Sequence, residues 1–249
     1  MSCEKNLKKS NKRTARDVLI GIGYQFVKFT GAPSAFLWFR PRRLYPYGRK
    51  RVKGGVLISS NHRTFLDPII VHLTFPGRTL YSLATKDLYT SKLRTFFFNM
   101  AQCIVVDKDN FSLSSFHTVV NKLKAGKAVV IFPEGQVNRN ENDTMLAFKS
   151  GAALMAFKSN APILPMYIVK QEKWWHRQTV VVGEVFYVSE LAGKMPTMND
   201  LTRVSDHLRE EEIRLREYYE AWHADRRNKK KQTETNKEKQ GEKHEHQYL

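Results

Sequence analysis

Short apolar runs rich in β-branched residues alternate along the chain with segments in which apolar residues recur at helical spacing. This alternation is typical of α/β folds, in which helices pack on a mostly parallel sheet. The runs that predict strands are 56–60, 79–84, 103–106, 128–132, 163–169 and 179–188. The segments that predict helices are 68–75, 88–100, 113–125 and 147–158. We therefore expect an α/β domain with a mostly parallel central sheet flanked by helices.

The C-terminal part of the chain predicts one more helix and then a tail. Asn199 or Asp200 can cap this helix, because either side chain accepts a hydrogen bond from a free backbone N–H group. The apolar stripe that would dock it on the domain consists of Leu201, Val204, Leu208, Leu215, Tyr219 and Trp222. Residues 226–249 are rich in Lys, Glu, Gln and Asn and cannot bury enough apolar surface to offset the entropy of ordering. We predict that this tail is disordered.

Residues 1–53 predict a basic N-terminal arm with amphipathic helices. The apolar segment 18–39 is interrupted by polar residues and a Gly-Ala-Pro break, and the remaining runs are too short to cross a bilayer. The residues that would share one helical face are Val18, Ile22, Phe26 and Phe29. This face suits either the headgroup layer of a membrane or packing on the domain. The folded domain is expected to span residues 54–225.

The distribution of charge narrows the class of partner. Lys and Arg number 42 against 24 Asp and Glu, which gives a net charge of +18. Residues 1–53 hold 14 basic and 2 acidic residues and residues 225–249 hold 8 and 5, so the chain between them is nearly balanced. A nucleic-acid-binding fold carries its basic stripe on the folded surface, so this pattern argues against nucleic acid and favours an anionic membrane surface. We expect monotopic association with the cytoplasmic face of a membrane.

The first candidate catalytic residues follow the predicted strand 56–60. Asn61 and His62 stand at its carboxyl end, where open α/β sheets place their functional sites. Asp67-Pro68 is a helix-start signal, which can bring the carboxylate within reach of the imidazole. A carboxylate that fixes the tautomer of a histidine prepares it to act as a general base on a hydroxyl. The spacing by itself also fits a helix cap beside an exposed histidine.

A second predicted strand, 128–132, ends in a Pro-Glu-Gly turn that contains Glu134. A carboxylate at this edge of the sheet can bind an acceptor hydroxyl, whereas Pro and Gly alone indicate only a turn. Ser59 and Ser60 precede His62, but neither lies in a nucleophile-elbow sequence. We therefore expect direct attack by a substrate hydroxyl and no acyl-enzyme.

These motifs resemble the two signatures of the glycerolipid acyltransferases, the family that includes 1-acylglycerol-3-phosphate acyltransferase. The matching residues are Asn61-His62 with Asp67, Phe132-Pro133-Glu134-Gly135, Ile104-Val105-Val106-Asp107-Lys108 and Ala161-Pro162-Ile163-Leu164-Pro165. The resemblance implies the α/β fold of that family, with His62 as the base and Asp67 as its partner. The acceptor-site residues that we assign on this basis are Asn61, Lys108, Glu134 and Gly135.

The chain departs from that family at positions associated with the acceptor phosphate. Similar enzymes usually have Gly at position 102, Arg at 108 and Thr-Arg after the Glu-Gly pair. This chain has Gln102, Lys108, Gln136 and Val137. Lys offers a point charge where Arg offers a planar fork, so recognition of the phosphate must differ. Arg139, which we include in the acceptor site, or Lys149 can supply the missing charge, and a solvated surface role fits either residue as well.

The predicted reaction transfers a fatty acyl group from acyl-CoA or acyl carrier protein to a lysophospholipid hydroxyl, foremost 1-acylglycerol-3-phosphate to give phosphatidate. The sequence has no nucleotide-type glycine pattern and no metal-ligand or redox spacing around Cys3 and Cys103, so we predict no cofactor beyond the acyl carrier. Two alternatives stay open: acylation of another lysolipid or lipid alcohol, and a non-catalytic basic protein that binds membrane or RNA. Trp174 and Trp175 suit either the membrane interface or packing under a loop.

Overall fold

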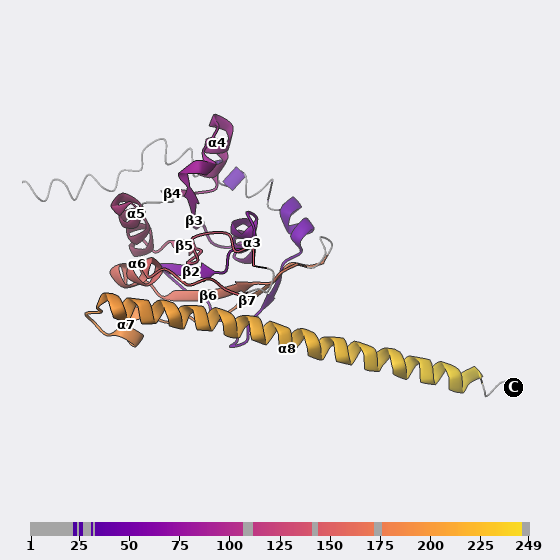
Figure 1. The fold of residues 1–249 in the computed structure, drawn as a ribbon. Helices are drawn as coiled ribbons and strands as arrows, with labels where there is room; N and C mark the ends of the chain where they lie inside the picture. The colour runs from indigo at the N-terminus through magenta and orange to yellow at the C-terminus, as the bar shows by residue number, and fades with distance from the viewer. Residues whose placement is uncertain are drawn as a thin grey trace, which may run out of the picture.

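A seven-stranded sheet forms the centre of the computed structural model, which describes residues 22–23, 25–26, 31, 33–106, 112–140, 144–171 and 176–245. The strands are β1 Arg42–Leu44, β2 Val56–Ser60, β3 Leu80–Thr85, β4 Ile104–Val106, β5 Ala128–Ile131, β6 Ile163–Ile168 and β7 Thr179–Val182. They are arranged in the order β1-β7-β6-β2-β5-β3-β4 (Figure 1). Every neighbouring pair is parallel except β6 with β7. The predicted α/β class with a mostly parallel sheet is confirmed.

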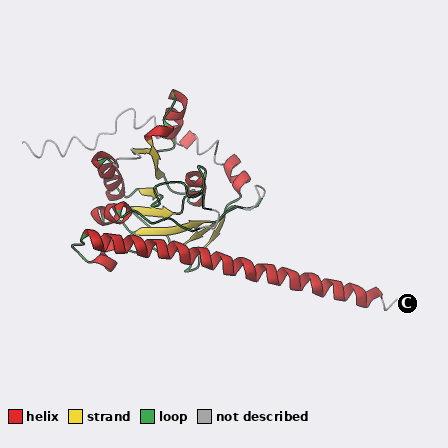
Figure 2. Cartoon of the chain, viewed as in Figure 1, coloured by secondary structure: helices red, strands yellow, loops and turns green. Residues whose placement is uncertain are grey.

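Helices cover both faces of the sheet, as Figure 2 shows. They are α3 Asp67–Thr74, α4 Lys92–Met100, α5 Leu113–Lys124, α6 Gly151–Ser159, α7 Val188–Ala192 and α8 Met198–Glu245, with a 3-10 turn at Lys86–Leu88. Because successive side chains of a strand point to opposite faces, β2 contributes to two cores. Leu57 packs with α5, α6 and α8, whereas Ile58 packs with α3 and with Phe39.

Several boundaries differ from the sequence prediction, among them the start of the predicted helix 88–100, which begins at Lys92 in the structure. Residues 42–44, assigned to the N-terminal arm, form β1 and pair with β7, so the sheet begins before residue 54. Strand β7 ends at Val182, and the chain then turns into α7 instead of continuing to residue 188. Helix α6 begins at Gly151 and not at residue 147, because the preceding loop is held by hydrogen bonds of its backbone to the turn after β5.

The last helix, α8, extends far beyond the domain (Figure 1). Its first half docks through the buried side chains of Leu201, Val204, Leu208 and Leu215. Residues 226–245, predicted to be disordered, continue the same helix in the structure. A docked helix supplies the nucleus, so each further residue adds a hydrogen bond without a new nucleation cost, and Lys, Glu and Gln favour the helix. The i,i+4 pair of Asp225 with Lys229, 2.8 Å apart, adds local support.

Most of the predicted N-terminal arm lies outside the described residues. The described part is helical at residues 33–39, and Ile22 and Phe26 are helical and exposed. None of the described helices is both long and apolar enough to cross a membrane.

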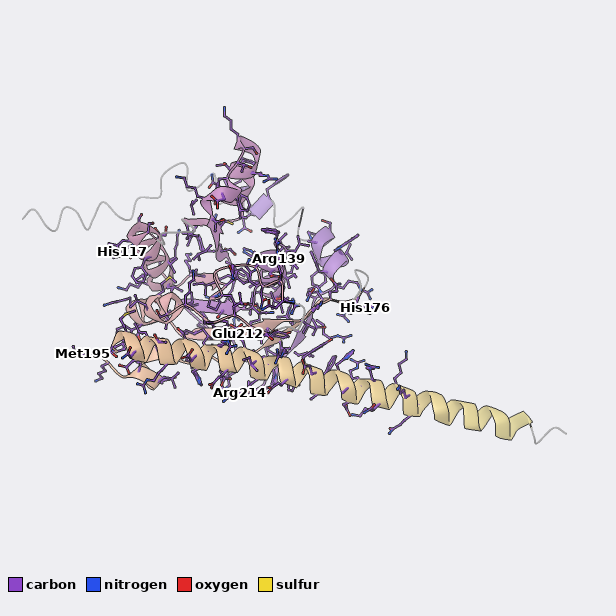
Figure 3. The ribbon with its side chains drawn as sticks, viewed as in Figure 1. His117, Arg139, His176, Met195, Glu212 and Arg214 are labelled. Carbon is purple, nitrogen blue, oxygen red and sulfur yellow. The ribbon has the colours of Figure 1, made fainter. Side chains whose placement is uncertain are left out.

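Glu212 is a fully buried carboxyl group beneath the sheet. Figure 3 shows it on the side of α8 that faces the strands, with Arg214 on the opposite side. One carboxyl oxygen accepts a 2.6 Å hydrogen bond from the Ser59 hydroxyl, and the other has no partner among the described residues. Burial raises the pKa of Glu212 well above its ordinary value, the Ser59 hydrogen bond opposes this shift, and the charge of Glu134 adds to it. Burial therefore favours the neutral form of Glu212 in the folded domain.

This burial predicts a specific pH dependence of stability. Above the ordinary pKa near 4.5 the unfolded chain releases the Glu212 proton while the folded domain retains it, so stability falls as pH rises toward the raised pKa. Glu212→Gln keeps an acceptor for Ser59 and abolishes this slope. Relative to wild type, its free energy of unfolding should improve by about 1.4 kcal/mol for each pH unit within that window. Chemical denaturation at a series of pH values measures this, with the exposed Glu217→Gln as the matched control; parallel pH profiles for all three proteins would contradict it.

Candidate active site

His62 and Asp67 meet at the carboxyl end of β2. The Nδ1 atom of His62 lies 2.9 Å from Oδ2 of Asp67, whose side chain is buried at the start of α3. The same carboxylate accepts hydrogen bonds from the backbone N–H groups of Arg63 (2.6 Å) and Thr64 (2.8 Å) and from the Thr64 hydroxyl (2.8 Å). Because an ionised carboxylate only accepts, Nδ1 carries the proton and Nε2 is left to act as a base. The predicted contact between this histidine and its carboxylate is present.

The imidazole of His62 is further held by the turn after β5. It stacks on Phe132 with 4.2 Å between ring centroids and an interplanar angle of 22°. The backbone of His62 is fixed on both sides, because its carbonyl accepts a 2.6 Å hydrogen bond from Asn138 N–H and its own N–H donates to Glu134. Phe132 was not predicted to touch the histidine. The sequence feature that could have indicated this contact is the position of Phe132 directly before the Pro-Glu-Gly turn, which is predicted to lie at the same end of the sheet as His62.

Glu134 joins the two loops that carry the site. Its Oε1 accepts from His62 N–H at 3.0 Å and its Oε2 from Leu146 N–H at 3.1 Å, and the residue is buried. It lies at the predicted edge beside His62, but both oxygens are engaged by the backbone. In this geometry the carboxylate positions the histidine loop. Its predicted contact with an acceptor hydroxyl stays a prediction.

Asn61 has a structural task at the end of β2. Its Oδ1 accepts from Ile168 N–H at 2.7 Å and its Nδ2 donates to the Ile168 carbonyl at 3.0 Å, so the side chain pairs with β6 much as a backbone amide would. The residue is buried and does not line the cleft described below. Both polar atoms of Asn61 thus already hold β6 beside β2, and its predicted part in substrate binding stays a prediction.

The two serines before His62 are also committed to structure. Ser59 donates to Glu212, and Ser60 donates to the Asn61 side chain at 3.3 Å. Both side chains are buried in the sheet, so neither can reach a substrate. This agrees with direct attack by a substrate hydroxyl.

His62 opens onto a cleft of about 2310 Å³. Its walls are mostly apolar and include Phe65, Ile69, Leu88, Phe98, Ala101 and Val106, with Phe36 and Leu37 of the helical segment 33–39 on one side. Cys103 also lines the cleft, where burial raises the pKa of its thiol to about 12. This thiol stays neutral and is no competing nucleophile. A cleft of this size and character can hold an acyl chain beside the histidine.

Cationic side chains lie at the same cleft. Arg139 and Lys149 both line it, as does Gly135, whose φ of 72° favours glycine. A Cβ added at Gly135 would lie 2.9 Å from Cε and 3.0 Å from Nζ of Lys149, so the Lys149 side chain extends over this turn. Among the described residues, neither the Lys149 ammonium nor the Arg139 guanidinium forms an ion pair with a carboxylate. Lys108, Trp174 and Trp175 lie outside the described residues.

Comparison with known proteins agrees with this geometry. The sequence profile of the family described as Acyltransferase matches residues 42–169. The 1-acyl-sn-glycerol-3-phosphate acyltransferase of Streptococcus pneumoniae is 25% identical over 183 residues, which cover 69% of this chain and 64% of that protein. The enzyme of the same name from Bacillus subtilis is 31% identical over 111 residues, 45% of this chain and 54% of that protein. The chain thus spans between about half and two thirds of the length of these curated relatives.

The fold itself has a counterpart among solved structures. The crystal structure of the 1-acyl-sn-glycerophosphate acyltransferase PlsC from Thermotoga maritima superimposes with a TM-score of 0.55 at 17% identity, over 86% of each chain. At this identity the likeness establishes a shared fold. The family profile covers half of the chain and includes both loops that meet at His62, from β2 through the turn after β5. The chain therefore belongs to the acyltransferase family.

Proposed function

We propose that this protein transfers a fatty acyl group from a thioester to the hydroxyl of a lysophospholipid, foremost 1-acylglycerol-3-phosphate. The observation that carries the proposal is the His62 imidazole, oriented by Asp67 and placed at the mouth of an apolar cleft. Relatives with that activity in their names match the chain over 183 and 111 residues. The donor is acyl-CoA or acyl carrier protein, which share the thioester chemistry.

The reaction requires one base that later acts as an acid. Nε2 of His62 takes the proton of the acceptor hydroxyl while that oxygen attacks the thioester carbonyl. When the tetrahedral intermediate collapses, the C–S bond breaks and the thiol leaves with the proton from Nε2. Asp67 stabilises the imidazolium between these steps and keeps the ring in place. No residue is acylated, in keeping with the buried positions of Ser59 and Ser60.

The acceptor phosphate is assigned to Lys149 and Arg139. Both line the same cleft as His62, and Lys149 extends over the glycine of the Pro-Glu-Gly turn. Val137, where similar enzymes have an arginine, also lines the cleft and offers no charge. A phosphate bound by these two cations would place the glycerol hydroxyl near the histidine. The same substitution at position 137 favours a second candidate function, acylation of a lysolipid with a different headgroup.

Loss of the base should abolish turnover without loss of the fold. His62→Ala is expected to lower kcat by about 100-fold or more, as for removal of a general base. Asp67→Asn should also lower kcat, because the amide can no longer accept from Nδ1 and from both backbone N–H groups in the same way. Steady-state assays with labelled acyl-CoA, and separately with acyl carrier protein, measure this against a panel of lysolipids. Thermal unfolding serves as the control for folding. Wild-type activity in His62→Ala would leave the non-catalytic binding protein as the surviving alternative.

Removal of the Lys149 charge should raise KM for acceptors that carry a phosphate and leave KM for uncharged acceptors unchanged. Lys149→Met keeps the chain length and is expected to raise KM for lysophosphatidate by roughly tenfold or more, the effect of losing a charge-assisted hydrogen bond. KM for an uncharged monoacylglycerol should not change. Lys158→Met, on helix α6 shortly after Lys149, removes an equal charge outside the cleft and is the matched control. Equal KM values for both variants and wild type would contradict the assignment of the acceptor phosphate to Lys149. They would leave the proposed role of His62 unaffected.

A further inference from the structure

Three arginines from distant parts of the chain come together at the outermost strand of the sheet, and two of them lie over one tryptophan ring. Arg42 comes from β1, Arg177 from the segment before β7, and Arg226 from α8. The guanidinium carbon of Arg42 lies 5.3 Å from the centroid of the Trp222 ring, and that of Arg226 lies 5.0 Å from it. Both cations thus stack on the same indole, an arrangement stabilised by the quadrupole of the ring.

The like charges of this cluster are not neutralised within the described part of the chain. Burial, and then the charges of Arg226 and Arg177, lower the pKa of Arg42, and the Tyr219 phenol is the group that opposes them. The described acids nearby on α8 have other partners: Glu220 lies 3.7 Å from Arg216, and Asp225 pairs with Lys229. Cations brought this close repel one another unless an anion joins them. The cluster is therefore built to receive a negative group.

The arginine cluster lies at the same end of the strands as His62. Strand β6 runs parallel to β2, β7 runs antiparallel to β6, and β1 runs parallel to β7. The beginnings of β1 and β7 therefore lie where β2 ends. Three strand spacings separate β1 from β2, or about 14 Å along the edge.

Exposed apolar side chains border the cluster. The helical segment 33–39 is tied to it by hydrogen bonds from Gln178 N–H to the Phe39 carbonyl (2.9 Å) and from Arg177 Nε to the Arg40 carbonyl (3.1 Å). On this segment Leu37 is 74% and Trp38 61% exposed, and Leu37 also lines the cleft. The rim of the cleft thus combines solvent-facing apolar groups with guanidinium groups. This is the composition of a surface that sits at a membrane interface.

We propose that Arg42, Arg177 and Arg226 form a binding site for the headgroup phosphate of an anionic phospholipid in the bilayer, next to interfacial Leu37 and Trp38. A bilayer fits better than a soluble phosphate compound, because Arg177 and Arg226 are exposed and do not line the cleft. The site would hold the mouth of the cleft against the lipid surface, and it gives α8 a part in membrane contact.

Vesicle binding by the full-length protein tests this site without any turnover. The variant Arg42→Gln/Arg226→Gln removes two cluster charges, and Arg49→Gln/Arg227→Gln removes two exposed charges from the neighbouring β1–β2 loop and from α8. Sedimentation with phosphatidylcholine vesicles, with and without phosphatidylglycerol, measures the partition coefficient. Each cluster charge should contribute about fivefold on the anionic vesicles, so the cluster variant should bind about 25-fold more weakly, and the control variant should lose far less. On neutral vesicles the two variants should bind alike.

Several outcomes would overturn the proposal. Equal losses in the two double variants would mean that net charge alone governs binding, and an unchanged cluster variant would remove the site. Weaker binding of coenzyme A by calorimetry, with unchanged vesicle binding, would assign the cluster to the acyl donor. Arg177→Gln leaves both stacked arginines in place, so its expected fivefold loss keeps the test valid if the double variant unfolds. Because no step involves catalysis, these results are independent of the His62 experiments.

Discussion

The carboxylate of Asp67 gathers four hydrogen-bond donors at one buried point. Removal of a carboxylate from water costs several kcal/mol unless it is compensated, and here the Nδ1 of His62, two backbone N–H groups and the Thr64 hydroxyl provide the compensation. The loop after β2 and the ionised Asp67 therefore depend on each other. As a result the imidazole is held in one orientation, which suits the role of base that we propose for it.

The strand order extends this constraint to the second motif. Strand β5 is the neighbour of β2, with Ser59 paired to Ile131, so the turn after β5 must lie beside the histidine loop. Glu134 uses that proximity to receive the N–H of His62. Beneath the sheet burial favours the neutral form of Glu212, and the charge of Glu134 is one cause of its raised pKa. Two negative charges close together in a low-dielectric medium would repel. Glu134 accepts from backbone N–H groups, and this repulsion favours the protonated form of Glu212.

The sequence was informative wherever local pattern determines structure. The central strands have β-branched apolar runs, and His62, Asp67 and Glu134 each follow a strand or begin a helix, so their common edge could be predicted. The pairing of Asn61 with β6 could not be predicted, because its partner Ile168 is 107 residues away. In the sequence, a polar residue with such a role cannot be told from any other polar residue at a strand end. Strand β1 is three residues of Arg-Arg-Leu with no strand pattern, and only its partner β7 makes it a strand. Likewise, residues 226–245 have too few apolar side chains to bury, so their composition predicts disorder. Composition alone carries no information on the docked helix that precedes this segment and that it continues.

The same limit applies to charge. By residue count, most of the excess positive charge belongs to the two terminal segments, and the folded domain between them is nearly neutral. In three dimensions, however, Arg42 from one terminal segment and Arg226 from the other stack on a single indole of the domain, and Arg177 joins them from a loop. Net charge per segment cannot reveal this, because Arg42 meets its partners Arg177 and Trp222 more than 130 positions along the chain. A diffuse basic arm would attract any anionic surface in any orientation. In the proposed membrane contact, fixed guanidinium groups beside the cleft would instead select one orientation, the one in which a lipid acceptor could reach His62 without leaving the interface.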